Sequence, residues 1–187
     1  MLLLFYCSQF VYILDIRSSY DYCSIIVGST LTTKFEGGLT LKRQDKYPDT
    51  DTFHFYNANP KGRITGDCVY RAIATATETH YHQVIRDLAE MAIKTGYSPA
   101  SKECYGKYLE SKGWVKHKQP KKWDNTKYTG KEFCKELMRY DSEIDSGNDL
   151  HHIVAHIGGH HIVAIISGQV WDIWNSTDGC IGNYWTK

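Results

Sequence analysis

The sequence has no excess of charge of one sign, no regular cysteine spacing and no internal repeat, and each absence excludes a class of protein. Its 187 residues carry 22 Lys and Arg against 21 Asp and Glu, a net charge of +1. The electrostatic field of a nearly neutral protein is too weak to recruit nucleic acid or an anionic membrane by itself. Hydrophobic residues at 42% and charged residues at 23% indicate a globular domain rather than a disordered or fibrous chain.

Six cysteines are scattered along the chain without a CxxC pair, at positions 7, 23, 68, 104, 134 and 180. This spacing indicates neither a disulfide framework nor a zinc ribbon, so we expect a reducing, cytoplasmic setting. The apolar residues 1–14 are interrupted by Ser8 and Gln9 and have no Lys or Arg ahead of them. They are also shorter than the roughly 20 residues that a spanning helix needs, so we expect neither a signal peptide nor an anchor.

A polar stretch with a proline, residues 41–50 (LKRQDKYPDT), predicts a boundary near residue 50. We expect an N-terminal extension over 1–50 and the working domain over 51–187. Two interpretations of the extension stay open. It forms a few strands from its β-branched and aromatic residues, or it lies outside the working domain and need not be ordered. The second is favoured, because the motifs of a complete domain follow without it.

Helical signals fill the first part of the working domain. Apolar residues recur at helical spacing over 69–76 and again over 81–91, with Gly96 as the expected stop. A third helix is predicted from Ser101, as its cap, to Gly113. A fourth starts at the capping box of residues 129–132 (TGKE).

After residue 150 the pattern changes to short runs rich in β-formers, at 153–155, 161–166 and 169–174. Ser167–Gly168 separates the last two runs like a two-residue hairpin turn. Helices therefore come first and an antiparallel sheet second, which predicts the α+β class.

The sharpest chemical feature is Cys68, which follows the tight-turn pair Gly66–Asp67 and begins a predicted helix. Free N–H groups and the helix dipole stabilise a thiolate at that position. The Asp67 carboxylate opposes this if it lies near the sulfur, although as an N-cap it would face the backbone instead. Taken alone, a cysteine beside an apolar stripe is more often a packed hydrophobic residue.

The hairpin register supplies a partner for this cysteine. With Ser167–Gly168 as the turn, His161 and Asp172 become diagonal neighbours on one face of the sheet, about 7–8 Å apart at the backbone. A carboxylate placed there can orient an imidazole and stabilise its charged form. His160 and Asn175 would pair on the opposite face, and a bulge would exchange the two faces. His160 and Asn175 therefore stay open as alternative base or orienting residues.

These segments resemble a family of small papain-like cysteine peptidase domains found in bacteriophages and the bacteria that carry them. The resemblance covers about residues 54–187. It is carried by residues 55–63 (FYNANPKGR), 65–73 (TGDCVYRAI), 161–168 (HIVAIISG), 170–175 (VWDIWN) and 180–185 (CIGNYW). It implies a papain-like fold in which the nucleophile heads a helix and the base lies on a facing antiparallel sheet. The chain order Cys68, His161, then Asp172 or Asn175 is the papain order.

Two departures from the family pattern bear on the site. The family often has an acidic residue at the position of Asn175, which leaves Asp172 as the better orienting carboxylate. Papain-like enzymes usually carry a glutamine about six residues before the cysteine to help build the oxyanion hole, and Gly62 stands here. The oxyanion would then be stabilised by the Cys68 N–H and by a second donor. The candidates for that donor are Asn57, Asn59 and Arg63.

Two other patterns suggest a metal site and a nucleic-acid site, and both are weaker than the cysteine–histidine pattern. Histidines crowd into positions 151, 152, 156, 160 and 161, upstream of Cys180. Neighbouring strand residues face opposite sides, so at most two or three of these side chains converge, and no HExxH motif accompanies them; no metal is expected. The basic segment 116–127 contains Trp123 but also a proline and no helical period, which is typical of a solvated loop rather than a nucleic-acid site.

We therefore expect a thiol hydrolase that cleaves an amide or isopeptide bond through an acyl-enzyme on Cys68 and needs no cofactor. A peptide or protein substrate is the expected partner, and neither a membrane nor nucleic acid is. The alternative is a catalytically inactive papain-like scaffold that binds a host protein or nucleic acid. The sequence predicts neither the oligomeric state nor the substrate.

Overall fold

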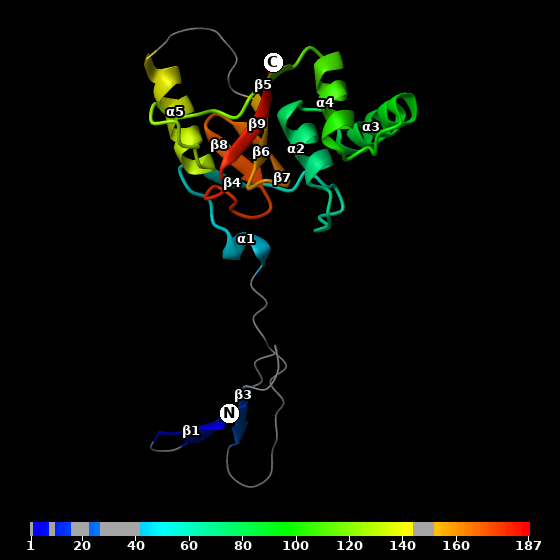
Figure 1. Cartoon of the computed structure of the whole chain (residues 1–187). Helices are drawn as coiled ribbons and strands as arrows, with labels where there is room; N and C mark the ends of the chain where they lie inside the picture. Colours follow the sequence, from blue (N-terminus) through cyan, green and yellow to red (C-terminus); the bar gives the residue numbers. More distant parts are fainter. Residues whose placement is uncertain (1, 8–9, 16–22, 27–41, 144–151) are drawn as a thin grey trace. The chain divides into compact units, whose positions relative to one another are not determined.

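The computed structural model describes residues 2–7, 10–15, 23–26, 42–143 and 152–187, and the chain divides into two compact units between Lys42 and Arg43 (Figure 1). The described strands of the first unit form a three-stranded antiparallel sheet. They are β1 (Leu2–Cys7), β2 (Phe10–Asp15) and β3 (Cys23–Ile26).

The second unit begins upstream of the boundary expected near residue 50. A short helix, α1 (Arg43–Lys46), opens it. Arg43 Nε donates to the carbonyl of Ile173 at 2.7 Å, and the Asp49 carboxylate accepts from the Phe55 N–H at 2.7 Å. Residues 43–49 therefore pack within the second unit, which carries every candidate site residue.

A six-stranded mixed sheet forms the centre of this unit, in the order β4-β8-β7-β6-β9-β5. Its strands are β4 (Phe53–Phe55), β5 (Val115–His117), β6 (His152–Ile157), β7 (His161–Ile166), β8 (Gln169–Asp172) and β9 (Ile181–Thr186). The α+β class is confirmed. A purely C-terminal antiparallel sheet is wrong, because β4 precedes α2 and pairs with β8 in parallel, and β5 lies between α4 and α5. Strand β4 satisfies the backbone groups of β8 on the edge that β7 leaves open.

Helices cover both faces of the sheet, as Figure 1 shows. The three helices α2 (Cys68–Ala76), α3 (Tyr81–Thr95) and α4 (Lys102–Ser111) contribute to one apolar cluster, with Val154, Ile162 and Trp185 from the strands. Helix α5 (Gly130–Glu143) contributes to the other cluster, on the opposite face. Because both faces are covered, β7 is apolar at successive positions instead of alternating.

The predicted helix ends are confirmed. Gly96 ends α3 in the left-handed conformation at φ 76°. Ser101 accepts from the Cys104 N–H at 3.3 Å. The capping box closes at the start of α5, where Thr129 Oγ1 accepts from the Glu132 N–H at 3.2 Å and Glu132 accepts in return from the Thr129 N–H at 2.9 Å.

Candidate functional site

Cys68 is the first residue of α2, and its side chain is half-buried. The helix lies on β7 because the apolar residues after Cys68, among them Ala72 and Ile73, are buried there. In the first turn, the Cys68 N–H has no acceptor within the helix, and the helix dipole favours negative charge. The thiol therefore lies where a thiolate is stabilised.

The hairpin of β7 and β8 positions an imidazole and a carboxylate. The turn residues Ser167 and Gly168 have φ of 47° and 74°, as a primed two-residue turn requires. Ile166 pairs with Gln169, which is the predicted register. This register brings the side chains of His161 and Asp172 together, with Nε2 and Oδ2 2.5 Å apart.

The Cys68 thiol and the His161 ring stabilise each other's charged form. Burial opposes the Cys68 thiolate, but hydrogen bonds from His161 and from the Ile162 and Val69 N–H groups outweigh it and lower the pKa of the thiol. Burial also opposes the charged ring of His161, yet hydrogen bonds to Asp172 and Cys68 raise its pKa to about 9. Both shifts favour a thiolate–imidazolium pair near neutral pH.

The His161 ring interacts with both other members of the site. Its Nε2 contacts Asp172, and the ring also interacts with the Cys68 thiol. The indole of Trp174 lies against the His161 ring, with centroids 5.1 Å apart. A cavity of about 230 Å³ opens beside His161 and is also lined by Trp174, Asn175 and Asp178. His161 therefore borders a cavity that can hold a group of a ligand.

Arg71 belongs to the site although the sequence reasoning missed it. Its guanidinium pairs with the Asp67 carboxylate and lies 3.6 Å from Asp172 Oδ1. Asp67 is the N-cap residue of α2, but its side chain makes no cap hydrogen bond. Its carboxylate instead pairs with Arg71 and accepts from the Tyr81 hydroxyl at 2.7 Å. The available signal was the i, i+4 spacing of Asp67 and Arg71 on a helix face that is otherwise apolar.

The alternative orienting residues have other surroundings. His160 is exposed in the turn before β7. Asn175 Oδ1 accepts from the N–H and the hydroxyl of Thr177, at 3.1 and 2.7 Å. The expected pairing of His160 with Asn175 is wrong, because β7 begins at His161 and β8 ends at Asp172. Among these candidates, it is Asp172 that contacts the His161 ring.

The three oxyanion candidates lie in the loop before α2. Asn59 Nδ2 donates to the Asp67 carboxylate at 3.0 Å and lies 3.3 Å from the Tyr81 hydroxyl. Asn57 Nδ2 donates to the Arg63 carbonyl at 3.3 Å. The Arg63 residue itself is exposed. Asn59 thus supports the charged network under α2, while Asn57 and Arg63 lie at the loop surface.

The histidine-rich segment is part of the core. His152 Nδ1 donates to the Ala76 carbonyl at 2.9 Å, and His156 hydrogen-bonds the Tyr105 hydroxyl. Burial lowers the pKa of His156 to about 4, so it packs as a neutral ring. His151 lies outside the described residues. Within the described ranges, no group of three or more His, Cys, Asp and Glu side chains could hold a metal ion.

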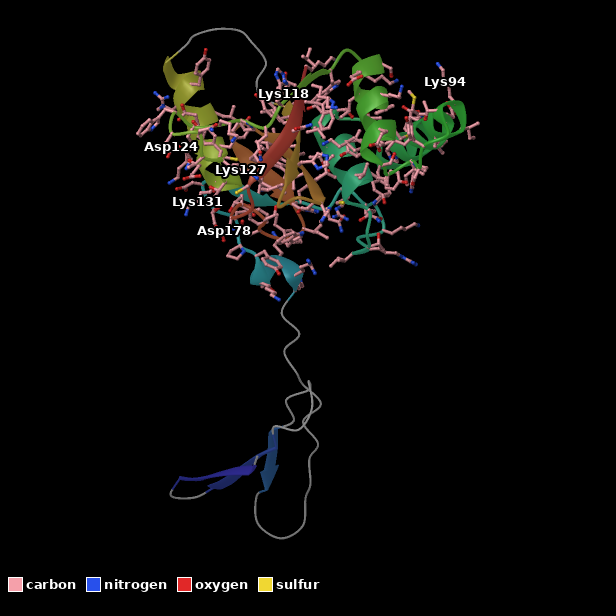
Figure 2. All side chains as sticks on the ribbon, viewed as in Figure 1. Lys94, Lys118, Asp124, Lys127, Lys131 and Asp178 are labelled. Carbon is pink, nitrogen blue, oxygen red and sulfur yellow. The ribbon has the colours of Figure 1, made fainter. Side chains whose placement is uncertain are left out.

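The basic segment 116–127 runs from β5 into an exposed loop. Lys122 Nζ is paired with Glu132 at 2.6 Å, and Trp123 is 98% exposed. Figure 2 shows Lys118 and Lys127 at the surface of the unit. A search of the described helices finds none that is long and apolar enough to cross a membrane.

No protein-family model, no curated protein and no solved structure matches this chain.

Proposed function

We propose that this protein is a thiol hydrolase, papain-like in arrangement, that cleaves an amide or isopeptide bond in a peptide or protein. The observation that carries the proposal is the contact of His161 Nε2 with Asp172 at 2.5 Å, in a ring that also interacts with the Cys68 thiol. A nucleophile, a base and an orienting group in hydrogen-bonded sequence are what nucleophilic acyl transfer needs.

In the proposed reaction, the Cys68 thiolate attacks the carbonyl carbon and forms a tetrahedral intermediate. The His161 imidazolium then gives its proton to the leaving nitrogen, and the C–N bond breaks to leave a thioester on Cys68. Water attacks the thioester while His161 takes up its proton. The acid product departs, and the thiolate–imidazolium pair is restored. Asp172 holds the ring throughout and stabilises its positive charge.

The oxyanion of the tetrahedral intermediate needs donors close to Cys68. The Cys68 N–H, free of a helical acceptor, is the first donor. The Asn59 amide donates to Asp67 and to the Tyr81 hydroxyl, whereas the Asn57 amide has one such bond, to the Arg63 carbonyl. Arg63 and Asn57 are therefore the second-donor candidates that remain. A reaction lacking a strong second donor would be slower by about 10²–10³ in kcat.

The papain-like arrangement is supported by the way α2 packs on β7, with the nucleophile at the helix start and the base on the sheet. Membership of the phage-associated papain-like family remains part of this proposal. A reducing compartment such as the bacterial cytoplasm suits the four free thiols of the second unit, which are Cys68, Cys104, Cys134 and Cys180.

The test is alkylation by a limiting dose of iodoacetamide from about pH 5 to pH 10, followed by intact mass and peptide mapping. Cys68 should react fastest, because burial raises the pKa of Cys104 and raises that of Cys134 to about 12. Exposed Cys180 is the internal control for access. The fast reaction should disappear in His161→Ala. If Cys68 is labelled slowly, and equally slowly in His161→Ala, the hydrolase is rejected. That result would favour a non-catalytic scaffold that binds a host protein or nucleic acid.

A further inference from the structure

A buried guanidinium connects the helix of Cys68 to the strand of Asp172. Arg71 lies one turn into α2 and is 5% exposed, Asp67 immediately precedes the helix and is 6% exposed, and Asp172 ends β8 and is 4% exposed. Arg71 Nη1 pairs with Asp67 Oδ1, and Nη2 lies 3.6 Å from Asp172 Oδ1. One cation is therefore shared by two buried carboxylates on two different elements.

Both carboxylates are fixed by further donors. The Tyr81 hydroxyl donates to Asp67 Oδ2 at 2.7 Å, and the Ile173 N–H donates to Asp172 Oδ1 at 2.8 Å. The guanidinium is planar, with its donors in a rigid fork, so it holds two fixed acceptors at a set separation. A lysine ammonium is a point charge on a flexible stem and cannot span them in the same way.

Arg71 is the buried cation that pairs with both carboxylates. Arg43 of α1 also acts on its guanidinium, and the His161 ring is shared with Cys68. Burial lowers the pKa of the Arg71 guanidinium, and the Asp172 carboxylate opposes this. Two carboxylates are met by Arg71 and by the His161 imidazolium. Without Arg71, both carboxylates would depend on His161 and on neutral donors, and Asp172 would lose one of the contacts that fix its orientation toward the ring.

We propose that Arg71 is a positioning residue for the reaction proposed above, because its guanidinium sets the separation between the start of α2 at Cys68 and the end of β8 at Asp172. The inference rests on the proposed function. Arg71 acts through the two carboxylates and touches neither substrate nor the reacting atoms. Its effect reaches the thiol through Asp172 and then through His161.

Two variants and a control test this inference by the pH dependence of Cys68 alkylation. Arg71→Lys keeps the charge and loses the fork. The double variant Asp67→Asn, Arg71→Met removes the cation together with one carboxylate, so no unpaired charge is left at position 67 to unfold the protein. The matched control is Arg86→Lys, which changes an exposed arginine on α3 that donates to Gln83.

In both Arg71 variants, the pH of half-maximal Cys68 alkylation should rise by about one pH unit, with a rate near neutral pH about tenfold lower and an unchanged rate at the alkaline plateau. Asp67→Asn removes a negative charge from the residue next to Cys68, which by itself would lower the pH of half-maximal alkylation. A rise in the double variant therefore comes from the lost guanidinium. Arg86→Lys should match the wild type.

A folded variant of Arg71 that keeps the wild-type pH profile overturns the inference, whether or not its melting temperature falls, since a purely structural role changes stability alone. The His161→Ala variant separates this failure from failure of the proposed function. If His161→Ala also keeps the wild-type profile, the hydrolase itself is rejected. If His161→Ala loses the fast reaction and both Arg71 variants retain it, the role of Arg71 alone is rejected.

Discussion

Replacing Asp172 by asparagine tests whether its negative charge, rather than its shape, charges the ring of His161. The two side chains have the same shape, and Asn Oδ1 can still accept from the Ile173 N–H, which now donates to Asp172 at 2.8 Å. Asp172 is 4% exposed, so little water screens its charge. The substitution therefore keeps the backbone contact, removes the charge and places an N–H donor where Asp172 Oδ2 contacts His161 Nε2.

The expected size of the effect follows from the titration of His161. Burial alone would lower the pKa of His161 below its ordinary 6.5, so the rise to about 9 comes from its partners, with Asp172 the largest of these. A neighbouring carboxylate moves a pKa by about 1 to 3. We therefore expect the pKa of His161 in Asp172→Asn to lie between about 6 and 8. Alkylation of Cys68 near neutral pH should slow by about tenfold or more.

The assay is an NMR titration of the His161 Cε1 proton, together with the alkylation profile of Cys68. The matched control is Asp178→Asn, because Asp178 lines the cavity beside His161 but is exposed to water. In that control the pKa of His161 should change by no more than about 0.3, since exposed charges interact weakly. The reasoning is refuted if His161 still titrates near 9 in Asp172→Asn, or if both variants shift it equally.

Three further predictions concern stability. The raised pKa of His161 stabilises the folded protein fully below about pH 6.5, and this stabilisation is lost as the pH rises past about 9. In urea unfolding, His161→Gln should therefore cost up to roughly 3 kcal/mol in acid and clearly less at alkaline pH. A cost that does not change with pH would contradict this prediction. Thr129→Ala should lower the free energy of unfolding by about 1 kcal/mol through the lost cap. The control Thr126→Ala should cost less, because it loses only an exposed hydrogen bond to Asp124. Gly130→Ala places a Cβ 2.7 Å from Ile157 Cδ1 and should cost about 1–3 kcal/mol, and an unchanged melting temperature would show that the contact yields freely.

The hairpin and the helix ends could be predicted because their signals are local. Ser167–Gly168 can adopt the two positive φ angles of its turn, and that turn alone sets the register that brings His161 to Asp172. The capping box at Thr129 and the left-handed Gly96 likewise depend on a few neighbouring residues. For this reason the histidine and its carboxylate could be named before the structure was known.

The parallel strand and the buried arginine could not be predicted in the same way. Strand β4 has only three residues and finds its partner, β8, far along the chain, so no local pattern indicates the pairing. In the sequence, Arg71 is a polar residue within an apolar helix face. Only the fold shows that it lies beside Asp172. Both features depend on tertiary contacts between residues that are distant in sequence.

The pairing of β4 with β8 has a consequence for how the chain is made. It joins Phe53 to Val170 and Phe55 to Asp172, so a ribosome must release almost the whole second unit before this edge of the sheet can form. A nascent chain that ends before residue 161 contains the cysteine of α2 but neither its imidazole nor its carboxylate. Non-local pairing also slows folding. The thiol therefore acquires its partners only after residues 161–172 have been made, and a shorter nascent chain carries a cysteine without them.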